Sequence, residues 1–153
     1  EAKVEPNSIS YNAGISACEK GSQWEHALML VAEIEDGKLE PNVISYTAVI
    51  SACDKGMRWQ QAVSLLSGLR QARKEPDVVS YSAGIGACGR GEQWQGALSL
   101  FTEMRGAKVE PDAISYNTGI SACEKGAQWR RALSLLSEMI ETKVEPDVIS
   151  YSA

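Results

Sequence analysis

The stretch YNAGISACEKG at residues 11–21 occurs four times in this sequence with small changes. It returns as YTAVISACDKG at 46–56, as YSAGIGACGRG at 81–91 and as YNTGISACEKG at 116–126. The copies are 35 residues apart, and the residue after the tyrosine varies while most of its neighbours are constant. Repetition with such a period is typical of proteins built by stacking one structural unit.

The scarce residue types follow the same period. Every proline, tryptophan, cysteine and tyrosine among the 153 residues recurs at intervals of 35. The chain is therefore expected to be one array, in which the end of one unit at 1–7 and the start of another at 148–153 flank four complete units. The complete units are 8–42, 43–77, 78–112 and 113–147.

Each unit carries two apolar stripes with helical spacing. In the second unit Tyr46, Ile50 and Cys53 lie at i, i+4 and i+7, which predicts a first helix. In the first unit another stripe runs from Trp24 to Ile34, which predicts a second helix. No alternating strand pattern occurs in the sequence. Because one helix pair has little partner surface of its own, the units must stack, and the predicted fold is an all-α solenoid.

The sequence lacks the constellations that catalysis or metal binding requires. The only histidine, His26, is replaced by Gln61, Gly96 and Arg131 in the other units, a variety that predicts a solvent-facing position. The four cysteines lie in different units without a C-x-x-C motif, and equivalent helices about 8–10 Å apart exceed the reach of a disulfide. We therefore expect buried free thiols, no cofactor, no metal and no enzymatic activity.

Two features are open to alternative interpretations. The tryptophans begin the second stripe, which favours core packing, although aromatic rings also stack on bases of single-stranded nucleic acid. One cation ends each first helix, where it either complements the helix dipole or contacts one phosphate per unit of a bound strand. These cations are Lys20, Lys55, Arg90 and Lys125. The net charge of −5 opposes nucleic-acid binding through bulk positive charge.

The second unit shows the residues that carry a family resemblance. They are Val43-Ile44-Ser45-Tyr46-Thr47 at its start, Lys55-Gly56 at the helix break, Ala62 and Leu65-Leu66 in the second helix, and Glu75-Pro76-Asp77 at its end. With the 35-residue period, this pattern resembles the pentatricopeptide repeat (PPR) family over essentially the whole chain. The resemblance implies a right-handed superhelical α-solenoid that binds single-stranded RNA, one base per repeat, and catalyses no reaction.

In that family two residues of each repeat jointly select the base: the one after the tyrosine and the one after the closing proline. The resemblance assigns these reading roles to Asn12 with Asn42, Thr47 with Asp77, Ser82 with Asp112, and Asn117 with Asp147. All are short hydrogen-bonding side chains of the kind that meets a base edge, although the residues after proline are also suited to cap a helix. The family's preferences imply the base order C-G-G-U.

The resemblance assigns two further roles. The terminal cations of the first helices would contact phosphates, and the aliphatic residue three positions before each first reader would flank the bases. The flanking residues are Ile9, Ile44, Val79, Ile114 and Ile149.

Two features of the sequence depart from the family pattern. Residues 8–42 carry a net charge of −4, with Glu33, Glu35 and Asp36 in the second helix, which would weaken RNA binding if they faced the groove. Glycines also replace larger aliphatic residues at Gly14 and equivalent positions, which predicts closer or looser helix pairs.

The alternative function is a helical scaffold that docks another protein, which the negative net charge favours. No run of 18 apolar residues occurs, so a membrane is not an expected partner. Without a catalytic constellation, a small-molecule substrate is not expected either. The resemblance implies a place in mitochondria or plastids, in RNA processing, stability or translation. No targeting segment is recognisable, and because EAKVEPN at 1–7 matches the ends of later units, we expect a longer parent protein.

Overall fold

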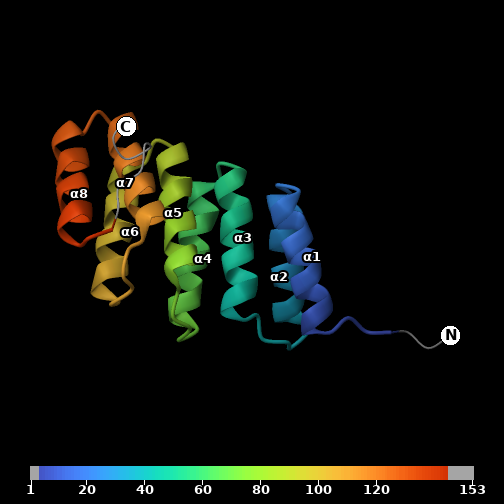
Figure 1. Ribbon diagram of the computed structural model, residues 1–153. Coiled ribbons are helices and arrows are strands. Elements are labelled where there is room, and N and C mark those ends of the chain that lie inside the picture. The colour runs from blue at the N-terminus through green and yellow to red at the C-terminus, as the bar shows by residue number, and fades with distance from the viewer. Residues whose placement is uncertain (1–3, 145–153) are drawn as a thin grey trace.

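The computed structural model describes residues 4–144, and within them it has eight α-helices of 13 residues each and no strand. The first helices of the four units are α1 (Ser8–Lys20), α3 (Val43–Lys55), α5 (Val78–Arg90) and α7 (Ala113–Lys125). The second helices are α2 (Trp24–Asp36), α4 (Trp59–Gln71), α6 (Trp94–Gly106) and α8 (Trp129–Glu141). The pairs follow one another in chain order along one line (Figure 1). The all-α prediction is confirmed.

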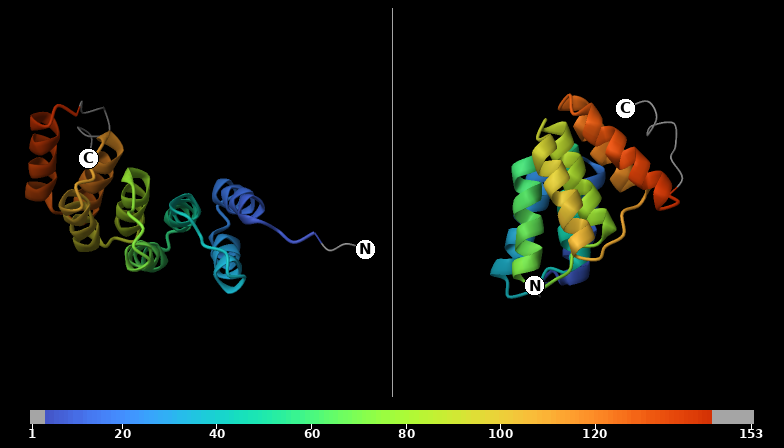
Figure 2. Two further views of the ribbon diagram at one scale, coloured as in Figure 1. Left: turned by 90° about the horizontal axis from the view of Figure 1, so that it is seen from below. Right: turned by 90° about the vertical axis from the view of Figure 1, so that its left-hand side faces the viewer.

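Stacking of the pairs gives two layers. The first helices α1, α3, α5 and α7 pack on one another in that order. Each second helix packs on the first helix of its own unit, and α2, α4 and α6 also pack on the first helix of the next unit. Later pairs are turned relative to earlier ones, as the views from below and from the end show (Figure 2). The first helices therefore form a continuous twisted layer, and the predicted site residues belong to this layer.

Within residues 4–144, the residue after each proline is the N-cap of a first helix. Asn42 Oδ1 and Asp77 Oδ1 each accept a hydrogen bond of 2.8 Å from the backbone N–H three residues later, at Ser45 and Ser80. Such an N-cap stabilises a helix by about 1 kcal/mol because it satisfies an otherwise unpaired donor. The capping interpretation of these positions is thus correct, and the caps hold the same side chains to which the resemblance assigns base reading.

The core lies between the two layers. Ile15, Ile50, Leu66 and Ile85 are completely buried there. A side chain at Gly84 would overlap Leu66 Cδ1, so leucines of the second helices fill the space that a larger residue would take. Of the two outcomes expected for glycines in the first helices, the structure shows the closer packing.

The cysteines lie under the first helices as free thiols, as predicted. Cys53, Cys88 and Cys123 are buried and Cys18 is half-buried. Burial in apolar surroundings raises the pKa of the Cys53 and Cys88 thiols to about 11. Their neutral form is therefore the one the fold accommodates.

Trp24, Trp59 and Trp94 pack across the junctions between units, whereas Trp129 on α8 is 63% exposed. Trp24 lies against Gly56 of the next unit, where a Cβ would lie 2.5 Å from the indole Cδ1, and Trp59 lies in the same way against Gly91. The guanidinium of Arg58 covers the Trp24 ring at 4.5 Å. The core-packing interpretation is therefore correct for Trp24, Trp59 and Trp94 with one refinement: these rings are half-buried, and part of their cover comes from the following unit.

Candidate nucleic-acid interface

One buried serine joins the two predicted base readers of the second unit. Ser80 Oγ lies 2.5 Å from Thr47 Oγ1 and donates a hydrogen bond of 2.7 Å to Asp77 Oδ1. Ser80 has no exposed surface, whereas Asp77 is exposed. Asp77 Oδ2 makes no hydrogen bond within residues 4–144, so it stays open to an outside donor. The structure thus places the two readers beside each other, with one serine as their common partner.

The same arrangement recurs at two other junctions. The linked sets are Asn12, Ser45 and Asn42, with distances of 2.5 and 2.9 Å from the serine Oγ, and Ser82, Ser115 and Asp112, both at 2.8 Å. These linking serines are almost completely buried. The sequence analysis missed them as site residues, although the serine two positions before each first reader recurs in every unit. That constancy was the available signal.

The predicted readers differ in how much surface they expose. Asn12 and Thr47 are half-buried, while Ser82 is 8% exposed and Asn117 9% exposed. The remaining predicted positions, Asp147 and Ile149, lie outside the described residues. The reading roles therefore stay predictions, with the geometry of three pairs now known.

The predicted base-flanking residues form an exposed aliphatic column along the first helices. Ile9 is 76% exposed, Ile44 71%, Val79 57% and Ile114 65%. Apolar side chains of this size are normally buried, so a repeated exposed position needs an explanation other than core packing. Bases inserted between these side chains would cover them.

Three hollows follow one another across the layer of first helices. The first, of about 350 Å³, contains Asn12 and Thr47; the second, of about 230 Å³, contains Ser82; the third, of about 290 Å³, contains Asn117. Neighbouring hollows share lining residues, so they form one continuous line past the readers. This line has the direction that a single strand laid along the units would take.

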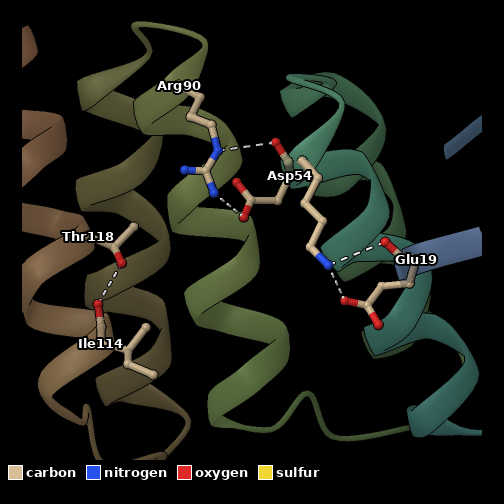
Figure 3. Close-up of polar contacts among 6 residues, drawn as sticks. Glu19, Asp54, Arg90, Ile114 and Thr118 are labelled. Atoms are coloured by element: carbon tan, nitrogen blue, oxygen red, sulfur yellow. Dashed lines mark hydrogen bonds and ion pairs between the residues drawn. The ribbon is translucent and has the colours of Figure 1, made fainter. Parts of the chain in front are cut away.

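The predicted phosphate-contacting cations are not equivalent. Lys55 Nζ is paired with Glu19 at 2.7 Å, and Arg90 is paired with Asp54 at 2.7 Å (Figure 3). Each pair joins the cation of one unit to the acidic residue that precedes the cation of the unit before. Lys20 and Lys125 make no ion pair within residues 4–144. The sequence analysis missed these acidic partners because they lie next to a cation of their own unit.

Three acidic residues of the first unit lie away from the hollows, whereas Glu19 of α1 lines the first hollow. Glu33, Glu35 and Asp36 belong to α2, and none of them lines the three hollows. Glu35 instead accepts a hydrogen bond of 2.7 Å from the Tyr46 hydroxyl. The three acidic residues of α2 therefore do not face the hollows, and the acid of this unit that does, Glu19, is paired with Lys55.

Two other kinds of site find no support in the described residues. His26 is exposed, as predicted, and no cluster of three or more His, Cys, Asp or Glu side chains within 4–144 could hold a metal ion. No helix in the same range has both the length and the apolar character needed to cross a membrane.

The fold and the period define a helical-repeat protein, and comparison with known families identifies the repeat. The chain belongs to the PPR repeat family, which it matches over residues 6–55, 76–125 and 111–153. A comparison with curated proteins found no match.

Solved structures with the same fold include several PPR proteins. The PPR10 structure from maize superposes with a TM-score of 0.82 at 21% identity, over 97% of this chain and 21% of that chain. PPR10 in complex with an 18-nt psaJ RNA element gives 0.81 at 22% identity, over 96% and 22%. The PPR domain of Arabidopsis thaliana PRORP1 in complex with tRNA gives 0.84 at 12% identity, over 97% and 79%. The chain thus spans about a fifth of the PPR10 structures, and these identities establish the fold alone.

Proposed function

We propose that the chain binds single-stranded RNA sequence-selectively, one base per repeat, in organellar RNA processing, stability or translation. The observation that carries this proposal is a composite surface repeated along the array. At each of the three described junctions, an exposed aliphatic residue stands beside a serine-linked pair of hydrogen-bonding side chains. Splayed bases need this combination, because an apolar flank supports the ring while the polar pair meets its edge.

The PPR relatives support the proposal at the level of ligand class. PPR10 and the PPR domain of PRORP1 are both known in complexes with RNA. The proposed base order is C-G-G-U, from the four reader pairs in chain order. Binding alone would give the protein its effect, since an occupied strand is closed to nucleases and to base pairing.

Reciprocal exchange of first readers tests the proposal. Thr47→Asn should move the second base from G toward U, and Asn117→Thr should move the fourth from U toward G. Fluorescence anisotropy would measure the binding of RNAs that contain C-G-G-U, C-U-G-U or C-G-G-G, with a scrambled RNA and the matching DNA as controls. Discrimination of about tenfold or more per base is expected for a hydrogen-bonded base contact. Equal binding of all RNAs by the folded protein would refute base reading.

A protein scaffold is the second candidate, and one observation favours it. Trp129, Leu133 and Ile140 on α8 are each more than half exposed, which gives this end of the described array an apolar face. A folded chain that binds none of the RNAs at low salt would favour the scaffold over the RNA-binding module.

A further inference from the structure

The position before each terminal cation differs among the units. It holds Glu19, Asp54, Gly89 and Glu124 in the four units. Each of the first two acids reaches the cation of the following unit, as Figure 3 shows for Glu19 and for Asp54 with Arg90. Gly89 has no side chain with which to pair the next cation, Lys125. The acid is therefore missing at one junction only, that between α5 and α7.

The ion pairs at the first two junctions hold their cations closely. Lys55 Nζ donates to both a carboxylate oxygen and the backbone carbonyl of Glu19, at 2.7 and 3.3 Å. Arg90 donates to Asp54 Oδ2 at 2.7 Å and to the Asp54 carbonyl at 3.3 Å. The Asp54 carboxylate is only 14% exposed, and it packs on Gly86, where a Cβ would lie 2.8 Å from Oδ1. A phosphate that approaches either cation must therefore compete with a carboxylate already in place.

The third junction has space instead of a carboxylate. Gly86, Gly89 and Lys125 line the hollow of about 290 Å³, together with the reader Asn117. Arg90 also lines this hollow, but its guanidinium is paired with Asp54. Lys125 is thus the one cation of this hollow that makes no ion pair within residues 4–144.

We propose that the residue before each cation sets how strongly that junction holds an RNA phosphate, so that Lys125, opposite Gly89, is the main backbone anchor among the three junctions between first helices. The carboxylates of Glu19 and Asp54 act as internal substitutes for a phosphate and weaken contacts at Lys55 and Arg90. The inference rests on the proposed RNA binding. It explains how an acidic chain can hold RNA at one strong point and read bases with little backbone affinity elsewhere.

Restoring the missing acid gives a matched pair of variants. Gly89→Glu recreates the Glu19–Lys55 arrangement at the third junction, and Gly89→Gln has the same shape without the charge. A Cβ at Gly89 would lie 3.2 Å from Ala122 Cβ, a tight contact that both variants share. Any packing cost therefore cancels between them, and circular dichroism would confirm that both are folded.

The readout is RNA affinity as a function of salt concentration. We expect Gly89→Glu to bind a C-G-G-U RNA about five- to tenfold more weakly than Gly89→Gln at low salt, with a salt slope smaller by about 0.7, the share of one phosphate on a single strand. Equal affinity and equal slope for the two variants would overturn the inference. If the unchanged protein binds no RNA, the proposed function fails instead, so the two failures are distinguishable.

Alanine variants of the cations provide a second, independent comparison. Lys125→Ala should weaken binding several-fold more than Lys55→Ala, because Lys55 is paired with Glu19 whereas Lys125 makes no ion pair within residues 4–144. Glu19→Gln should strengthen binding, since it releases Lys55. A loss at Lys55→Ala that equals or exceeds the loss at Lys125→Ala would refute the assignment of the anchor.

Discussion

Replacing Gly91 by alanine tests whether contacts between indole and glycine hold the units together. An added Cβ would lie 2.9 Å from Trp59 Cγ, closer than real Cβ atoms approach ring carbons. The backbone itself tolerates alanine, since φ is −82° at Gly91. Gly21 has the same φ, but its nearest neighbour would be its own helix, at 3.4 Å from Ala17 O. Gly21→Ala is therefore a matched control without the tryptophan.

The expected magnitudes follow from these two environments. Glycine to alanine at a compatible φ stabilises a protein by about 0.4–1 kcal/mol, whereas overpacking costs about 1–3 kcal/mol. We expect Gly91→Ala to lower the free energy of unfolding by about 1–2 kcal/mol and Gly21→Ala to leave it unchanged or raise it slightly. Urea unfolding followed by circular dichroism measures both. Equal effects of the two substitutions would refute the idea that Trp59 packed on Gly91 stabilises the junction.

Three other predictions concern the buried polar groups. Ser80→Ala should lower the free energy of unfolding by about 1–2 kcal/mol, since it removes hydrogen bonds to Thr47 and Asp77. The same substitution should relax base selection at the second position, which fluorescence anisotropy would measure with RNAs varied at that base. Burial and the neighbouring Glu103 raise the pKa of Tyr81 to about 12. An unfolded tyrosine ionises near pH 10, so stability should fall between about pH 10 and pH 12, by an amount of order 2–3 kcal/mol for this residue, and Tyr81→Phe should remove that share of the loss in alkaline urea titrations. Cys18, which is half-buried, should react with a thiol reagent in the native state. Cys88 is buried and its pKa is raised to about 11, so it should react only after unfolding. Mass spectrometry of the labelled peptides would measure both rates, and equal rates in the native state would contradict the described burial.

Periodicity alone was enough to predict the helices, because apolar spacing and capping residues are local signals. The role of Gly56 could not be predicted from its neighbours in sequence. The sequence explains it as a helix end, yet its φ is −82°, and the left-handed residue of that turn is Met57, with φ of 56°. Glycine is needed there because Trp24 of the preceding unit lies against it. Such a reason lies in the junction between units, which no single copy of the repeat displays.

Part of the candidate site could likewise be predicted from the sequence, while its contacts between units could not. Periodicity singled out the variable residue after the tyrosine, but its partner became visible only in space: Ser80 is 33 residues beyond Thr47. The ion pair of Lys55 with Glu19 likewise spans 36 residues. In both cases the interacting groups occupy different positions of the repeat, so comparison of equivalent positions does not reveal them.

The serine link has a consequence for how such arrays change over time. Each linked set takes its first side chain from one unit and its serine from the next, so a unit that is copied, lost or moved needs a suitable neighbour. Every complete unit offers the same serine at the same place, namely Ser10, Ser45, Ser80 and Ser115. The serine that this link requires is therefore present whichever unit follows. Reordering whole 35-residue segments would keep that serine at every join, so recombination could bring together new combinations of reader residues.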